Sequence, residues 1–363
     1  MPPALHAANT GGTPVPRASK LAGYMKRPFP YNHRPMLSAL SQRVLPVLQL
    51  TRMALVFTAI SNAYCTALLL WAIPVDQALD PARMLAITAV SIGLYGFGMS
   101  LNDIIDRRRD RQIAAYRPLP SGRVGVTTAH TICTVLVTGA LAGGVIYASL
   151  SGHWMSLMLV ISAAGLIVFY DLAGKYLVAP GLLALGLIRF LHALVPAPQI
   201  PVLWHPLLLL DHVTILSTVA YAWERKRPRL TRIHWWSVLG GLAVINALVI
   251  AMVLQRRGAE GIGVALRLTP WLALPGAAVV AFACVGSWIW RHRAKRREAG
   301  QKLMLYGLLW LIVYDVCFVF AYVGWLPAVL MLLFLPVAYF SVQLMRWWST
   351  VLAISQRPDF KRA

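Results

Sequence analysis

Residues 84–105 read MLAITAVSIGLYGFGMSLNDII, an apolar run whose last turn contains Asn102 and Asp103. One helix needs about 20 apolar residues to cross a bilayer core. Comparable runs recur along the whole chain, at 46–73, 126–149, 153–172, 179–198, 204–223, 234–254, 269–290, 303–323 and 326–346. We therefore expect an all-α polytopic membrane protein, a helical bundle of about nine to ten transmembrane helices.

The composition agrees with a membrane protein and excludes an ordinary soluble domain. Hydrophobic residues make up 58% of the 363 positions and charged residues 13%, whereas soluble domains contain about 25% charged residues. The net charge of +22 does not indicate nucleic-acid binding, because the basic residues fall in short loops between apolar runs. The four cysteines stand singly in apolar runs, so neither a zinc site nor a redox pair is expected.

The distribution of Lys and Arg predicts the topology. With the N-terminus inside, 28 of the 34 Lys and Arg residues fall in alternate connections and termini, and four fall in the others. Cytoplasmic loops carry the excess of basic residues. This predicts ten helices with both termini in the cytoplasm, in a cytoplasmic (inner) membrane.

Three regions are expected along the chain. Residues 1–44 form a basic, proline-containing extension, predicted to be flexible and cytoplasmic, and no apolar segment of a secretory signal precedes the first long run. Residues 45–348 form the membrane domain, and residues 349–363 a short basic tail.

An acidic cluster follows the run 84–105. Spacings of three and four residues bring Asn102, Asp103, Asp106 and Asp110 close to one face of a helix. Neighbouring carboxylates repel one another, so the cluster needs a cation, and carboxylates combined with substrate phosphates are the pattern that binds Mg²⁺. The alternative is a solvated helix end whose aspartates pair with the adjacent arginines, Arg107, Arg108, Arg109 and Arg111.

A basic loop follows the acidic cluster. Residues 116–123 read YRPLPSGR, and the guanidinium group of Arg117 is well suited to phosphate oxygens. The cluster and this loop together resemble the first aspartate-rich motif of the UbiA superfamily of intramembrane prenyltransferases, and the resemblance runs from about residue 46 to about residue 225. It implies a UbiA-like helical bundle in which Mg²⁺ and an isoprenoid diphosphate are bound by Asn102, Asp103, Asp106 and Asp110, with Arg117 on the diphosphate.

A second element is similar to the Tyr-x-x-x-Lys sequence of that family. Tyr170 and Lys175 match it with one extra residue between them, and the resemblance implies that Tyr170, Asp171 and Lys175 face the same site. From the residues alone, Asp171 and Lys175 could equally form an ion pair across one helical turn.

The second acidic motif of the family is reduced here. Only Glu224 supplies a carboxylate, and Arg225, Lys226 and Arg227 follow it. This favours one Mg²⁺, with the basic run offsetting the remaining phosphate charge. Together with the segments around Tyr170 and Arg189, the Glu224 segment resembles the EboC-type branch of the superfamily.

Arg189 stands about ten residues into the run 179–198, near mid-membrane. A charge at that depth needs a partner. A diphosphate is one candidate, and Asp211 or Asp315 on another helix is the alternative. Asn62 is likewise polar at mid-depth, and the resemblance places it among the groups that bind the diphosphate, although an isolated Asn often bonds a neighbouring helix.

The implied reaction is Mg²⁺-dependent transfer of an isoprenoid group from a prenyl diphosphate to an unidentified acceptor, in a site that faces the cytoplasm. Asp103, Asp106, Asp171, Lys175 and Glu224 are the candidate catalytic residues. Two alternatives remain: an intramembrane terpene cyclase or diphosphate lyase, and a non-catalytic member that binds or transports a lipid.

Overall fold

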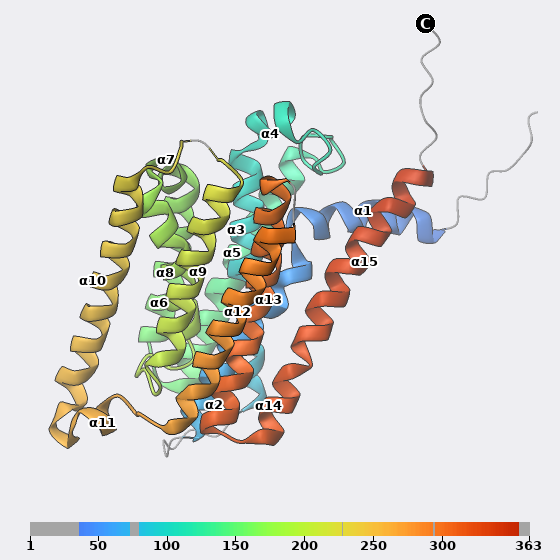
Figure 1. Cartoon of the computed structure of the whole chain (residues 1–363). Helices are drawn as coiled ribbons and strands as arrows, with labels where there is room; N and C mark the ends of the chain where they lie inside the picture. Colours follow the sequence, from blue (N-terminus) through green and yellow to red (C-terminus); the bar gives the residue numbers. More distant parts are fainter. Residues whose placement is uncertain (1–35, 73–79, 227, 293–294, 356–363) are drawn as a thin grey trace, which may run out of the picture. The chain divides into compact units, whose positions relative to one another are not determined.

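The computed structural model describes residues 36–72, 80–226, 228–292 and 295–355. All regular secondary structure within these ranges is helical (Figure 1). The unit Ser41–Ala363 is described here. Its elements, together with the helix that leads into it, are α1 (Met36–Leu50), η1 (Met53–Leu55), α2 (Val56–Ala72), α3 (Pro81–Ile105), α4 (Arg107–Ile113), α5 (Val126–Ser151), α6 (Met155–Phe169), η2 (Tyr170–Gly174), α7 (Lys175–Leu177), α8 (Ala179–Leu194), α9 (Trp204–Trp223), α10 (Arg232–Arg257), η3 (Gly258–Glu260), α11 (Ile262–Ala265), η4 (Pro270–Leu272), α12 (Ala273–His292), α13 (Arg296–Tyr322), α14 (Trp325–Leu332) and α15 (Phe334–Ser355).

Nine segments within the described ranges are long and apolar enough to cross a membrane. The tenth predicted helix is α8, which has 16 residues and ends at Leu194, two residues before Pro196. The expected all-α membrane bundle of about nine to ten helices is therefore confirmed. Large apolar side chains on its outer faces are exposed, among them Leu248, Val280 and Leu330, as expected for surfaces that meet lipid.

One predicted helix is divided in the structure, and each of the two predicted terminal regions includes part of a helix. The run 46–73 is not one helix, because α1 ends at Leu50 and Arg52 takes a left-handed conformation (φ 48°) before η1 and α2. Of the predicted extension 1–44, residues 36–44 belong to α1 and the rest lies outside the described residues. Of the predicted tail 349–363, residues 349–355 continue α15 and the rest again lies outside.

The short connecting elements mark the two ends of the bundle. Figure 1 shows α4 and α7 at one end, and α11 and α14 at the other. The long helices run between these ends in alternating directions, and α15 leans away from α13 as it approaches the α4 end (Figure 1). The acidic cluster at the junction of α3 and α4 and the Lys175 segment are thereby brought to the same end.

Small residues allow α3 and α5 to pack closely. A Cβ atom added at Gly93 of α3 would lie 2.5 Å from the carbonyl oxygen of Leu136 and 2.7 Å from the Cβ of Ala140. Val90, Leu94 and Phe97 continue this contact and pack with Val160 and Ile167 of α6. Close approach through small residues is the usual way in which membrane helices gain packing energy, since lipid offers no hydrophobic driving force between them.

The contact at Gly93 gives a stability prediction. Gly93→Val should separate α3 from α5 and destabilise the fold by about 1–3 kcal/mol, the usual effect of overpacking. Gly139→Val is the matched control on α5, because a Cβ there meets no atom within 4 Å. Thermal unfolding in detergent measures both variants, and equal melting temperatures would contradict this account of the interface.

Candidate active site

The acidic cluster lies where α3 ends and α4 begins. Asp106 is the C-cap residue of α3 and also the N-cap residue of α4. The Asp106 amide donates to the Asn102 carbonyl and the Asp110 amide donates to the Asp106 carbonyl, so the predicted helical spacing is kept. Asp103 and Asp110 are buried, each with 3% of its surface exposed. Asn102 and Asp106 are partly exposed. Two buried carboxylates at a helix end require cationic partners, because an unpaired buried charge is costly.

The loop that holds Arg117 and the segment that holds Asp171 and Lys175 both supply partners. Arg117 pairs with Asp110 at 2.6 Å and lies 3.6 Å from Asp103. Lys175 pairs with Asp106 at 2.7 Å. The side-chain amide of Asn102 donates to Asp171 at 2.7 Å. The predicted residues Asn102, Asp103, Asp106, Asp110, Arg117, Asp171 and Lys175 therefore lie in one contiguous site.

These contacts differ from both local alternatives that the sequence left open. The aspartates pair with distant cations rather than with the adjacent arginines 107–109 and 111. Lys175 pairs with Asp106 on another helix rather than with Asp171 one turn away. The cluster is thus an assembled site and not a solvated helix end.

Arg52 is a site residue that the sequence analysis did not identify. Its guanidinium group lies 3.5 Å from Asp103. The left-handed backbone at Arg52 (φ 48°, ψ 36°) is uncommon for a side chain with a Cβ, and it stands at the break between α1 and η1. In the sequence, the one indication that Arg52 has a role is its charge within an apolar run. Only the break in the helix explains how that charge reaches Asp103.

The loop that carries Arg117 is anchored by apolar contacts and backbone bonds. Leu119 and Val124 are buried against Leu50 and Ala129, and the Val124 amide donates to the Pro118 carbonyl. Partial burial lowers the pKa of the Arg117 guanidinium, but the carboxylates of Asp103 and Asp110 more than offset this effect, so its pKa is raised above the ordinary value. Arg117 is therefore a fixed cation at any accessible pH.

A π-helical turn positions Asp171. Residues Tyr170–Gly174 form η2, and i→i+5 bonding takes one more residue into a turn than an α-helix does. This turn coincides with the extra residue between Tyr170 and Lys175. Asp171 is 1% exposed and faces Asn102, while Lys175 reaches Asp106, so both polar groups of the segment point to the same cluster.

The donor set fits a hard divalent cation. Four carboxylates (Asp103, Asp106, Asp110 and Asp171) face three cations (Arg52, Arg117 and Lys175), which leaves an excess of negative charge. The Oδ1 atom of Asp103 is buried and accepts no hydrogen bond from the described residues. Carboxylate and amide oxygens are the ligands that Mg²⁺ takes from proteins.

Comparison with known proteins identifies the family. The family model described as the UbiA prenyltransferase family matches residues 62–312, well over half of the chain. The chain belongs to this family. No curated protein sequence matches it.

Three solved structures are similar to this UbiA family member. A structure of digeranylgeranylglyceryl phosphate synthase is 16% identical, covers 78% of this chain and 99% of its own, and superposes with a TM-score of 0.53. Two structures of a UbiA homologue from Archaeoglobus fulgidus are 13% and 12% identical, each covering 82% of this chain and 99% of their own, with TM-scores of 0.39 and 0.40. They were determined with DMAPP and Mg²⁺ and with GPP and Mg²⁺, respectively. The similarity to the synthase shows a UbiA-type fold.

Glu224, the remnant of the second acidic motif, lies at the end of α9. Its carboxylate pairs with Lys226 at 3.3 Å, and its side chain packs against Gly300 of α13. Among the described residues, no ion pair joins Glu224 to Arg52, Arg117 or Lys175, the cations of the acidic cluster. Tyr170 lies within electrostatic range of Asp106 and of Tyr221 on α9, so the end of α9 borders the cluster.

Asn62 and Arg189 belong to a second, deeper polar network. Arg189 is 9% exposed and donates to Asn62 Oδ1 at 3.2 Å and to Thr58 at 3.0 Å. The amide nitrogen of Asn62 donates to Asp315 at 2.8 Å. Arg189 therefore reaches Asp315 through Asn62, whereas Asp211 accepts a bond from Asn246. Arg189 stands ten residues into α8, about 15 Å from the helix end that follows Lys175.

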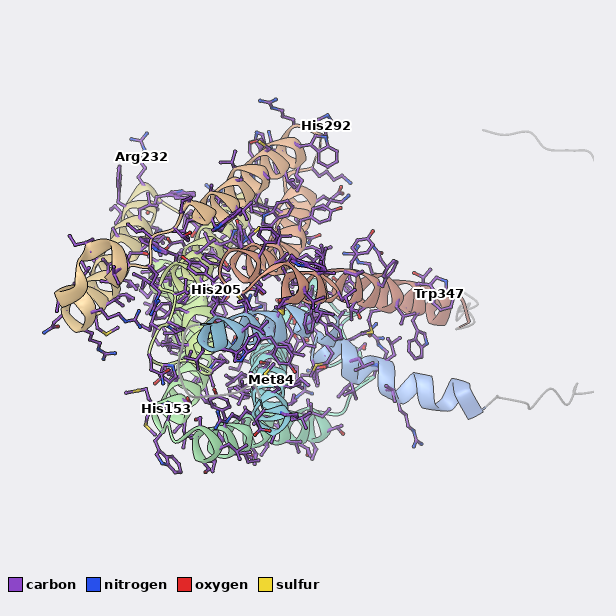
Figure 2. The ribbon with its side chains drawn as sticks, turned by 90° about the horizontal axis from the view of Figure 1, so that it is seen from below. Met84, His153, His205, Arg232, His292 and Trp347 are labelled. Atoms are coloured by element: carbon purple, nitrogen blue, oxygen red, sulfur yellow. The ribbon has the colours of Figure 1, made fainter. Side chains whose placement is uncertain are left out.

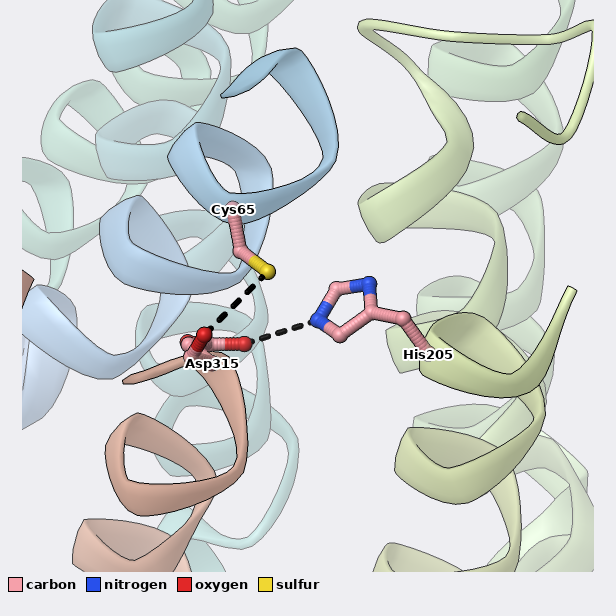
Figure 3. Close-up of side chains that lie close together, drawn as sticks. All are labelled: Cys65, His205 and Asp315. Carbon is pink, nitrogen blue, oxygen red and sulfur yellow. Dashed lines mark hydrogen bonds and ion pairs between the residues drawn. The ribbon is translucent and has the colours of Figure 1, made fainter. Parts of the chain in front are cut away.

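Asp315 is the centre of this network. It is fully buried and accepts a bond from Ser61 at 2.6 Å. It also accepts a bond from His205 at 2.7 Å (Figure 3). Figure 2 shows His205 in the middle of the bundle. One ligand atom each of Cys65, His205 and Asp315 lies within 4.8 Å of the others, which raises the question of a metal.

The described contacts favour a hydrogen-bond network over a metal at this place. Both Asp315 oxygens already accept hydrogen bonds, and the Cys65 thiol donates to the Asp315 carbonyl at 3.6 Å. The positive charge of Arg189 balances the Asp315 carboxylate through Asn62. Four helices (α2, α8, α9 and α13) meet in this network.

The network gives a second stability prediction. Arg189→Met leaves Asp315 buried without its balancing charge, and breaking a buried charge pair of this kind costs about 3–5 kcal/mol. Adding Asp315→Asn to that variant should recover much of the loss, because the carboxamide keeps an acceptor without the charge. Thermal unfolding in detergent measures this, and a double variant no more stable than Arg189→Met would refute the charge-balance account.

Proposed function

We propose that this protein catalyses Mg²⁺-dependent transfer of an isoprenoid group from a prenyl diphosphate to an acceptor within the membrane. The observation that carries the proposal is the convergence of Asn102, Asp103, Asp106, Asp110 and Asp171 with Arg52, Arg117 and Lys175 at one end of the bundle. Such a site offers both the oxygen ligands for Mg²⁺ and the donors for phosphate oxygens.

The ion pairs indicate how the site would receive its substrate. Asn102, Asp103, Asp106 and Asp110 would hold Mg²⁺, and Arg117, Lys175 and Arg52 would turn from their carboxylates to the diphosphate oxygens. Bound Mg²⁺ supplies neutralisation of the diphosphate charge, which eases cleavage of the allylic C–O bond. The electron pair leaves with the diphosphate, the carbocation is attacked by the acceptor, and the acceptor proton passes to a base, for which Asp171 and Glu224 are the candidates.

We propose that the deeper residues, Asn62 and Arg189, contact the substrate and not the metal. Asn62 and Arg189 are the remaining predicted diphosphate groups, with Tyr170 nearer the cluster. Arg189 lies about 15 Å, or nearly three helical turns, deeper in the bundle. Arg189 and Asn62 would therefore bind the diphosphate only by giving up their present bonds to Thr58 and Asp315. The apolar interior would hold the isoprenoid chain and exclude water from the carbocation.

The basic run at residues 225–227 supports two finer proposals. It replaces carboxylates of a second acidic motif, which favours a single Mg²⁺ and the EboC-type branch of the family. The excess of Lys and Arg at the α4 end also supports the proposal that this end, both termini and the active site lie on the cytoplasmic side of a cytoplasmic membrane.

Asp103→Asn and Asp106→Asn test the catalytic proposal. Each should reduce Mg²⁺-dependent diphosphate release from an allylic prenyl diphosphate by at least about 10²–10³-fold, the usual effect of removing one stabilising group. Purified protein is incubated with donor and a membrane-lipid extract, and added inorganic pyrophosphatase converts the released diphosphate to phosphate, which is then detected. Glu298→Gln is the matched control, since Glu298 is exposed and pairs with Lys295.

The products separate this proposal from its alternatives. Mass spectrometry should find a prenylated acceptor that requires both extract and donor. A cyclised or eliminated hydrocarbon formed without extract would indicate a cyclase or lyase. Diphosphate release unaffected by Asp103→Asn and Asp106→Asn would reject the metal site.

The metal stoichiometry is a separate prediction. Removal of divalent cations with EDTA should abolish release, and added Mg²⁺ should restore it along a single-site curve. Glu224→Gln should lower the rate by less than about tenfold, or ~1.4 kcal/mol, without changing the half-saturating Mg²⁺ concentration. A sigmoidal Mg²⁺ dependence that Glu224→Gln makes hyperbolic would instead establish a second metal at Glu224.

A further inference from the structure

An apolar groove lies away from the acidic site, between α12, α13 and α15. Its volume is about 580 Å³, and its walls include Trp288 of α12, Tyr306, Leu309 and Val313 of α13, and Tyr339 and Phe340 of α15. Cavities that hold small molecules span about 300–1,000 Å³. The groove is therefore large enough for a hydrocarbon chain.

One wall of the groove lies outside the region shared with the UbiA family. The family match ends at residue 312, within α13, and α15 spans Phe334–Ser355. In contrast to the acidic site on α3 and α4, the groove depends on a helix beyond the matched residues. We therefore infer the occupant of the groove from the residues that line and flank the groove, and not from the transfer reaction.

At one end of the groove, each of its three helices carries a cation. Lys302 precedes Tyr306 by one turn of α13, Arg291 follows Trp288 by nearly one turn of α12, and Arg346 follows Tyr339 by two turns of α15. These spacings keep each cation on the groove-lining face of its helix. Because α13 is antiparallel to α12 and α15, all three cations lie at the same end.

Two of the cations that flank the groove have no ion-pair partner among the residues that the structure describes. No ion pair joins Lys302 or Arg346 to another residue in the described ranges. Other cations of the same connection are engaged: Lys295 pairs with Glu298 at 3.6 Å, and Arg296 lies 3.3 Å from the centroid of the Trp290 ring. An apolar groove that ends in unpaired cations is complementary to an amphiphile with a negative head.

We propose that the groove binds an anionic phospholipid, with an acyl chain between α12, α13 and α15 and its phosphate beside Lys302 and Arg346. Basic pockets between membrane helices recognise anionic headgroups, and each Lys or Arg near the surface contributes an attraction equivalent to about a fivefold change in affinity. A zwitterionic lipid with the same chains gains less from these cations, so the site discriminates by headgroup.

Native mass spectrometry of the purified full-length protein tests the proposal. The protein is titrated with phosphatidylglycerol and phosphatidylcholine of identical acyl chains, and phosphatidylglycerol should be retained preferentially. The double variant Lys302→Gln with Arg346→Gln should reduce that preference by about 25-fold, from the fivefold contribution of each cation. Lys295→Gln is the control, because this cation of the same connection already pairs with Glu298.

A second variant tests the groove itself. Val313→Trp should fill it and reduce retention of both lipids, while Lys302→Gln with Arg346→Gln removes only the headgroup preference. Equal retention of the two lipids by the native protein would overturn the proposal, as would a preference that survives the double variant. A dimer that Val313→Trp dissociates without loss of bound lipid would also overturn it, in favour of a second copy of the chain.

Discussion

Buried charge that must be balanced inside a membrane protein is the constraint on which this structure depends. Asp103 and Asp110 are almost fully buried at the end of α3 and in α4, where an unpaired carboxylate would be costly. Arg52 and Arg117 balance them from two separate segments, while Lys175 balances Asp106 from a third. The break after α1, the anchored loop before α5 and the π turn after α6 are the backbone features that deliver these cations.

The same constraint organises the centre of the bundle. Asp315 on α13 is balanced by Arg189 on α8 through Asn62 on α2, and His205 on α9 completes the contacts. Lipid provides no hydrophobic force that would draw membrane helices together. Directional polar contacts therefore fix how these four helices meet, and the packing of small residues such as Gly93 brings α3 and α5 into register beside them.

The sequence predicts most of the fold and most of the residues of the acidic cluster, but not the contacts between them. Helical spacing is local, so Asn102, Asp103, Asp106 and Asp110 could be placed together from their positions alone, and the apolar runs located the helices. The partners of these carboxylates are set by contacts between residues far apart in the chain. From the sequence, Arg52 is a single charge inside a long predicted helix, because nothing in residues 46–73 predicts that the helix breaks at that point. Likewise, Arg189 could be expected to need a partner, but only the structure identifies Asn62 as the link to Asp315.

The balance of charge also bears on how many metals the site needs. The cluster holds one more carboxylate than cations, which attracts Mg²⁺, but a diphosphate brings more negative charge than one Mg²⁺ cancels. A second Mg²⁺ would supply the difference if a second set of carboxylates were present to hold it. Here the end of α9 offers Glu224 followed by Arg225, Lys226 and Arg227, and Glu224 already pairs with Lys226. Under the proposed function, these cations would provide the missing positive charge without a second metal, and the reduced second acidic motif and the basic run would be one compensated change.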